Sequence, residues 1–268
     1  MVSFPPCKIN LGLHVLAKRT DGYHDIETCF FPVPWTDVLE IIPSNDFHFS
    51  SSGFSIPGER EENLCIKAYK LLRGAHSLPP IKLHLHKILP MGAGLGGGSS
   101  DAAHTLRLLN SLFELKLTMA QLRNYASELG SDCSFFIGDE PMLGTGRGEI
   151  LTPIKVNLCG YQLVLVKPNV HVSTKDAYAG LTPKATAEQI RKILNQPVSD
   201  WKHALANDFE PSVFRKFPEI EKIKNRLYEL GAVYACMSGS GATVFALFEK
   251  PRSLHHEFAG CDYWQGFL

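Results

Sequence analysis

The stretch from Pro90 to Ala103, PMGAGLGGGSSDAA, decides how this chain is interpreted. Five of the seven residues from Gly92 to Gly98 are glycine. Glycine lets the backbone adopt positive φ angles and lets a ligand approach the main chain. Successive N–H groups can then face one anion, and a helix that follows adds about half a positive charge at its N-terminus. The stretch therefore predicts a phosphate-binding loop.

The flanking residues support this interpretation. Residues 81–86 (IKLHLH) alternate apolar and polar side chains, which predicts an amphipathic strand that ends at Pro90. Residues 100–112 have the pattern of a helix, and Ser99 and Ser100 are predicted to cap it. The two serine hydroxyls can also contact phosphate oxygens or a Mg²⁺ ion that accompanies the nucleotide.

Other glycine-rich motifs fit less well. A flexible linker seldom lies between an amphipathic strand and a capped helix. Gly92, Gly94 and Gly97 match the dinucleotide fingerprint G-x-G-x-x-G, which is weak on its own. The strand before it alternates instead of being continuously apolar, and no acidic ribose ligand follows about twenty residues later. No Gly-Lys-Ser/Thr ends the loop, so it is not a Walker motif.

The rest of the chain predicts an α+β fold with two units. A half-buried strand is expected at residues 7–16, and a polar surface helix with a loop at residues 184–200. Composition shifts near residues 151–160, so we expect domains at 1–153 and 154–268. The other predicted elements are helices at 61–73, 118–129 and 218–230 and strands at 161–166, 233–237 and 244–248.

Composition excludes several classes of protein. The 268 residues carry 27 Lys plus Arg and 27 Asp plus Glu, so no basic footprint for nucleic acid is present. No segment is apolar over the length needed for a signal peptide or a membrane span. The seven cysteines are scattered and show no C-x-x-C spacing, which fits a reducing cytosol better than a disulfide framework or a zinc site. We expect a cytoplasmic protein with small-molecule ligands.

Three stretches, in order, resemble the conserved motifs of the GHMP kinases. They are Cys7–Thr28 (CKINLGLHVLAKRTDGYHDIET), Pro90–Ala103, and Met237–Phe248 (MSGSGATVFALF). The resemblance implies a two-domain α+β GHMP kinase fold with the active site in the cleft between the domains. It also implies ATP and Mg²⁺ as cofactors.

The first stretch is similar to the branch that phosphorylates a cytidine diphosphate-linked methylerythritol, at its 2-hydroxyl, on the non-mevalonate route to isoprenoid precursors. The resemblance makes Lys8 and Asp132 the catalytic residues, with Asp132 accepting the proton of the substrate hydroxyl. It implies substrate contacts from Asn10, Tyr23, His24, Thr174 and Tyr178, and supporting roles for Gly239, Ser240 and Gly241. The residues that it implies for ATP binding are Pro90, Met91, Gly92, Ala93, Gly94, Leu95, Gly96, Gly97, Gly98, Ser99, Ser100, Asn63 and Asn110.

The chain departs from the family at two points. Cys133 and Ser134 stand where the family commonly has Val-Pro after the aspartate, and Tyr178 stands where it often has Phe. Three alternatives stay open at this stage. A homoserine kinase would need no base-stacking platform, a nucleotide-binding sensor would not need both Lys8 and Asp132, and an oxidoreductase would bind a nicotinamide cofactor.

Overall fold

The computed structural model describes residues 1–183 and 189–268. The chain forms two compact units, which are described separately below. Unit 1 comprises Met1–Cys7, Pro32–Met91 and Gly96–Glu140, and unit 2 comprises Lys8–Phe31, Gly92–Leu95 and Pro141–Leu268. These units interleave along the chain, whereas the sequence predicts one division after residue 153. That division stays a prediction.

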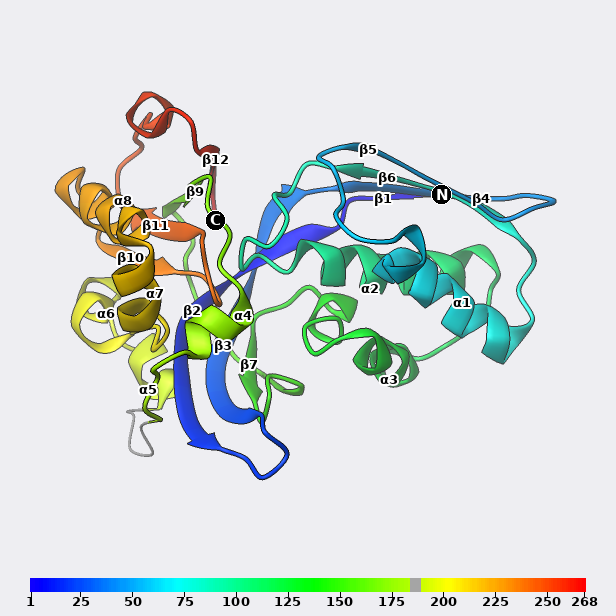
Figure 1. Ribbon diagram of the computed structural model, residues 1–268, viewed down its shortest axis with the longest axis horizontal. Helices are drawn as coiled ribbons and strands as arrows, with labels where there is room; N and C mark the ends of the chain where they lie inside the picture. The colour runs from blue at the N-terminus through cyan, green and yellow to red at the C-terminus, as the bar shows by residue number, and fades with distance from the viewer. Residues whose placement is uncertain (184–188) are drawn as a thin grey trace. The chain divides into compact units, whose positions relative to one another are not determined.

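Unit 1 is built on a four-stranded sheet with the order β1-β4-β6-β5. Helix α2 packs against helix α1 and against β4, and Figure 1 shows both helices along one face of the sheet. The bounds are β1 Val2–Ser3, β4 Val38–Pro43, β5 His48–Gly53, β6 Ile81–Lys87, α1 Leu64–His76, α2 Gly97–Leu112 and α3 Met119–Leu129. The expected alternation of β6 is confirmed, because Ile81, Leu83 and Leu85 are buried and Lys82 is exposed.

Capping residues set the helix ends in unit 1. Thr118 and Gln121 form a capping box at the start of α3, and Gly130 is its C-cap, as the sequence predicts. Helix α1 begins at Leu64, three residues later than predicted, because the Asn63 side chain accepts the Cys65 N–H and caps it. A short 3₁₀ turn, Arg60–Glu62, takes up the residues before it.

Unit 2 contains an antiparallel sheet with the order β10-β11-β9-β12. Helix α8 packs on β10 and β11, and its Ile220 and Leu227 join Val164, Val244 and Ala246 in the core. The bounds are β9 Gln162–Lys167, β10 Tyr234–Met237, β11 Val244–Phe248, β12 Asp262–Phe267, α4 Thr174–Tyr178, α5 Ile190–Leu194, α6 Val198–Ala204, α7 Glu210–Lys216 and α8 Pro218–Glu229. The predicted surface helix at 184–200 is replaced by the short helices α5 and α6, and its first five residues lie outside the described part.

A third sheet has the order β2-β3-β7-β8, with β2 Pro6–Lys18, β3 His24–Thr36, β7 Met142–Thr145 and β8 Ile150–Pro153. The expected half-buried strand at 7–16 is wrong in one respect, since β2 is buried from Cys7 to Val15 whatever the polarity of the side chain. The cause is packing within unit 2. Leu205 and Ile190 lie against Gly12, and a Cβ there would be 2.5 Å from Leu205 Cδ1. Buried polar groups on this strand must therefore find hydrogen-bond partners.

Candidate active site

The glycine loop has the backbone that its composition predicts. Gly92, Gly94 and Gly96 have φ angles of +60°, +76° and +72°, which L side chains rarely adopt. Gly94 also lies against other backbone, because a Cβ there would be 2.1 Å from the Ser238 carbonyl oxygen. Glycine at this position is therefore required by both the φ angle and the space.

The N-terminus of α2 supplies backbone donors for an anion. The helix begins at Gly97 with Gly96 as its N-cap, and no acidic side chain lies in its first turn. The Ser100 N–H donates to the Gly96 carbonyl (2.9 Å) and so makes a hydrogen bond of the helical type. The backbone N–H groups before Ser100 come ahead of the hydrogen-bond pattern of the helix. The expectation that Ser99 and Ser100 cap the helix is wrong, since both lie inside its first turn. The α2 residues Gly97 and Gly98 let the helix start earlier than the serines.

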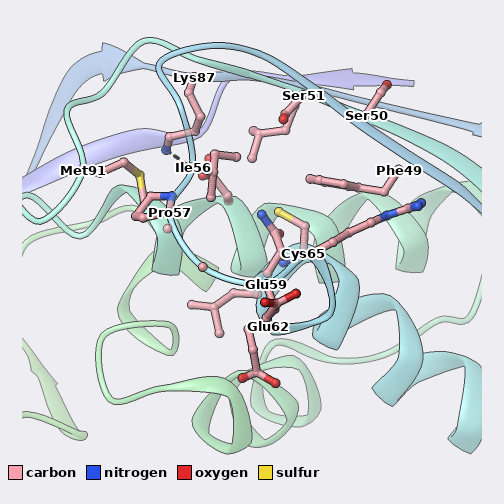
Figure 2. Close-up of a pocket in the computed structure, with 17 residues that line it drawn as sticks. Phe49, Ser50, Ser51, Ile56, Pro57, Glu59, Glu62, Cys65, Lys87 and Met91 are labelled. Carbon is pink, nitrogen blue, oxygen red and sulfur yellow. Dashed lines mark hydrogen bonds and ion pairs between the residues drawn. The ribbon is translucent and has the colours of Figure 1, made fainter.

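A pocket of about 420 Å³ lies beside this helix in unit 1. Figure 2 shows Phe49 and Cys65 in its wall, with Ile56, Pro57 and Met91 toward one end. The acidic side chains of Glu59 and Glu62 lie at its edge. The pocket also touches three residues that the sequence places in the nucleotide site, namely Met91, Gly98 and Asn63. A mostly apolar pocket next to helix N-terminal amides suits a planar base joined to phosphates.

Lys87 and Asp101 line this pocket, and with Asp37 they form a buried ion triad that the sequence reasoning missed. The Lys87 ammonium pairs with Asp37 and with Asp101 Oδ2 (2.8 Å), and all three side chains are at most 3% exposed. Asp37 Oδ1 accepts the N–H groups of Ile88 and Leu89 at 2.6 and 2.8 Å. The triad thus joins the end of β6 to the second turn of α2.

Burial and the neighbouring charges together set the pKa values of Asp101 and Lys87. Burial raises the pKa of the Asp101 carboxyl to about 7, although the nearby Lys87 ammonium opposes the shift. Burial lowers the pKa of Lys87, but the two carboxylates more than reverse this and leave it raised. Asp101 Oδ1 is buried without a hydrogen-bond partner among the described residues, as is the hydroxyl of Ser100. Both groups lie near the start of α2, where a ligand or water can satisfy them.

Lys8 lies in a buried polar cluster of unit 2. Its Nζ donates to Asn10 Oδ1 (2.6 Å) and to the Gly94 carbonyl of the glycine loop (3.1 Å). It also lies over the Phe30 ring, 5.4 Å from the centroid. Lys8 is only 4% exposed. The structure therefore brings the predicted Lys8, Asn10 and the first half of the glycine loop together.

The third motif packs on the same half of the loop. The Ser238 hydroxyl donates to the Gly94 carbonyl (2.9 Å) and accepts the Asn10 N–H (3.3 Å). Gly239 leaves room for both neighbours, since a Cβ there would be 3.2 Å from the Gly94 oxygen and 3.3 Å from Asn10 Oδ1. The Asn207 amide donates to the carbonyls of Met237 and Gly239 at 2.7 and 2.8 Å. Ser240 and Gly241 complete this turn before β11.

The residues expected to recognise a base form an aromatic group in unit 2. His24 stacks on Tyr178, with ring centroids 4.5 Å apart. Tyr23 is 56% exposed and lies under the Arg147 guanidinium. Thr174 is exposed at the first position of α4, the helix that ends at Tyr178. Exposed aromatic rings next to buried ones provide a surface on which a nucleobase can stack.

Asp132 lies half-buried in the turn after α3, in unit 1. Its backbone carbonyl accepts the Phe135 N–H (3.2 Å). Ser134, which replaces the family's proline, donates its hydroxyl to the Arg123 carbonyl (3.0 Å) and so ties the turn to α3. Burial raises the pKa of the neighbouring Cys133 thiol to about 11, and its hydrogen bond with Ser99 opposes this shift. The Cys133 thiol therefore stays neutral beside the carboxylate.

Asn110 has a different environment from the other predicted nucleotide contacts. Its amide donates to the Leu117 carbonyl (3.2 Å) and accepts the Leu117 N–H (2.9 Å). It is not one of the residues that line the 420 Å³ pocket. The Asn110 side chain thus shapes the connection between α2 and α3.

Within residues 1–183 and 189–268, no group of three or more His, Cys, Asp and Glu side chains is arranged to hold a metal ion. No helix in the same part of the chain is long and apolar enough to cross a membrane.

Comparison with known proteins gives the class of this fold and site. The family described as "GHMP kinases N terminal domain" matches residues 63–139, and "GHMP kinases C terminal" matches residues 186–256. The protein is thus a kinase of the GHMP type, which uses ATP as its phosphate donor.

Similar proteins show to which branch of the GHMP kinases the chain belongs. The chain is 52% identical to the 4-diphosphocytidyl-2-C-methyl-D-erythritol kinase of Cytophaga hutchinsonii, with 95% of each chain covered. It is 50% identical to the same enzyme of Bacteroides fragilis, with 97% of this chain and 98% of the relative covered. A crystal structure of 4-(cytidine 5'-diphospho)-2C-methyl-D-erythritol kinase matches 99% of this chain and 98% of its own at 32% identity, with a TM-score of 0.84. The chain belongs to the 4-diphosphocytidyl-2-C-methyl-D-erythritol kinase family.

Proposed function

We propose that this protein transfers the γ-phosphoryl group of ATP to the 2-hydroxyl of 4-diphosphocytidyl-2-C-methyl-D-erythritol. The observation that carries the proposal is the pairing of His24 with Tyr178, in a chain that also has the phosphate loop. A kinase for a small alcohol such as homoserine has no need of an aromatic group that can stack on a base. Family membership at about 50% identity over nearly the full length supports the same substrate.

ATP is proposed to bind with its base in the pocket of unit 1. The apolar side chains of Ile56, Leu64 and Met91 suit the faces of adenine, and Gly98 brings α2 amides beside the pocket. The phosphates then lie along the glycine loop and the helix N-terminus, where backbone N–H groups bind anions. The full set that we propose for ATP is the one expected from the sequence, with Asn110 shaping the site indirectly.

We propose Asp132 as the general base and Lys8 as the cation that stabilises transferring charge. The 2-hydroxyl oxygen attacks the γ-phosphorus, the bond to the bridging oxygen breaks to release ADP, and the hydroxyl proton passes to Asp132. Phosphoryl transfer depends mainly on alignment and charge neutralisation. The two polar acceptors around Lys8 Nζ hold its charge beside the loop residue Gly94.

Mg²⁺ is proposed as the accompanying ion. The donors present fit this hard cation, because the unpartnered hydroxyl of Ser100 and the hydroxyl of Ser99 are oxygen ligands at the start of α2. Magnesium commonly takes few protein ligands and several phosphate or water oxygens, which agrees with the absence of a larger cluster in the described residues. When bound, the ion would neutralise charge on the phosphates.

We also propose that the protein works in the cytoplasm and that its two domains divide after residue 153. All seven cysteines are free thiols, which supports work in a reducing cytoplasm. The division after residue 153 is supported by the two family matches, which end at 139 and begin at 186.

An ADP-release assay with ATP and Mg²⁺ tests the function. It compares 4-diphosphocytidyl-2-C-methyl-D-erythritol with homoserine, mevalonate and galactose, and mass spectrometry identifies the product. We expect turnover with the cytidyl substrate alone. Turnover of a different alcohol would overturn the assigned substrate, and ATP binding without any turnover would favour a nucleotide sensor.

A further inference from the structure

Thr28 lies at the centre of a buried hydrogen-bond chain that ends at Lys8. It is on β3, is 0% exposed, and is the last residue of the first motif, Cys7–Thr28, which assigns it no role. Its hydroxyl donates to the Gly12 carbonyl (2.6 Å), and its oxygen accepts from Asn10 Nδ2 (2.9 Å). Asn10 Oδ1 in turn accepts from Lys8 Nζ (2.6 Å). All of these groups belong to unit 2.

In this series of hydrogen bonds, the direction of each one follows from the one before it. A carbonyl only accepts, so the single proton of the Thr28 hydroxyl is committed to Gly12. The hydroxyl oxygen can then only accept, so Asn10 must turn its NH₂ group toward Thr28 and its oxygen toward Lys8. The opposite amide orientation would place NH₂ hydrogens against an ammonium group. Thr28 therefore anchors the nitrogen end of the Asn10 amide, while the oxygen end meets Lys8.

Gly12, at one end of this series of hydrogen bonds, has a rigid backbone. Gly12 has a φ of +70°, and a Cβ there would be 2.5 Å from Leu205 Cδ1, so its backbone is held by the surrounding core. Lys8 is a long side chain with many rotamers, and only fixed acceptors can hold its ammonium in one place. Asn10 Oδ1 and the Gly94 carbonyl both act as acceptors for it. One of them depends on Thr28.

We propose that Thr28 is a positioning residue for phosphoryl transfer, acting through Asn10 on Lys8; this rests on the proposed role of Lys8. Thr28→Val keeps the shape of the side chain and removes the hydroxyl. It should lower kcat roughly ten- to a hundredfold, since small misplacements of a catalytic group can cost about 10²-fold. The KM for ATP should change less than about threefold, because loss of a transition-state interaction acts on kcat. Thr28→Ser keeps the hydroxyl and should restore most of the rate.

Tyr234→Phe is the matched control for stability. It also removes one buried hydroxyl of unit 2, which donates to the Leu205 carbonyl (2.9 Å), outside the site. Both variants should show a similar loss of stability, as a lowered unfolding temperature and a lowered denaturant midpoint. Only Thr28→Val should lose kcat. Equal kcat in the two variants would show that Thr28 is merely structural.

A double-mutant cycle tests whether Thr28 acts through Asn10. In the Asn10→Ala background, Thr28→Val should lower kcat no further, because the connection is already broken. Additive losses would overturn the proposed route. Lys8→Ala tests the proposed role of Lys8 separately from that of Thr28. If it retains kcat, the proposed role of Lys8 is wrong; if it loses kcat while Thr28→Val does not, only the positioning role of Thr28 fails.

Discussion

The imidazole of His24 stacks on the phenol ring of Tyr178, with 21° between the ring planes and 4.5 Å between centroids. Phe209 meets Tyr178 edge-on at 4.7 Å and 73°. The two contacts hold the Tyr178 ring in a single orientation, and burial raises the pKa of its phenol, which stays neutral. A base that stacks on the face covered by His24 must take the place of the imidazole.

Tyr178→Leu should raise the KM for the cytidyl substrate about 5- to 150-fold, because stacking on an aromatic ring contributes about 1–3 kcal/mol per base. Tyr178→Phe keeps the stacking face and should change KM less than about twofold. Steady-state kinetics with each substrate varied in turn gives both values. If the KM for ATP rises as much as that for the cytidyl substrate, Tyr178 does not belong to the base site.

Asp132→Asn should lower kcat by about two to four decades, the usual range for a lost general base. Asp139→Asn is a control in the same unit. Asp139 pairs with Arg107 and with His104 (3.3 Å), so its loss should weaken folding and leave kcat near the wild-type value. Rapid-quench measurements of the chemical step check the result. A loss under threefold in Asp132→Asn would remove Asp132 from this role.

Gly94→Ala should abolish most activity, since the new Cβ would meet the Ser238 carbonyl oxygen at 2.1 Å and the φ of +76° disfavours alanine. Overpacking of this kind costs roughly 1–3 kcal/mol, and the backbone must shift to relieve it. Gly74→Ala in α1 meets nothing within 4 Å and should keep full activity with equal or higher stability. ATP affinity by calorimetry and unfolding temperature distinguish a shifted loop from a destabilised fold. Normal ATP affinity in Gly94→Ala would contradict the close packing of loop and third motif.

The sequence predicted the parts of the site whose signal is local. Consecutive glycines mark the phosphate loop because the chemistry needs consecutive amides. Ser238 lies in the third motif, but its contact with Gly94 could not be predicted, and Asn207 lies outside all three motifs; their partners lie far along the chain and only folding brings them together. Lys87 does carry a local signal. In the alternating strand of 81–87 it occupies the inward phase, where Ile81 and Leu83 are buried, and a lysine in that phase requires a buried counter-charge.

The buried Asp101 carboxyl should make stability depend on pH. Its pKa is about 7 in the folded protein against an ordinary value of 3.8, because burial outweighs the attraction of Lys87, and Asp37 adds repulsion. Ionisation therefore costs the folded state more than the unfolded state. The contribution of Asp101 is fully present below about pH 4 and is lost as the pH rises to about 7, with a slope of at most about 1.4 kcal/mol per pH unit.

Asp101→Asn removes this titration and keeps the size of the side chain. Denaturant unfolding at several pH values between 5 and 8 gives the free energy of unfolding of wild type and variant. In the difference between the two, the contributions of the other titrating groups cancel. Relative to the variant, the wild type should lose stability from pH 5 to 7 and then level off, since the carboxyl is fully ionised above its folded pKa. Parallel curves across this range would mean that Asp101 is ionised throughout, held by Lys87 as a permanent ion pair.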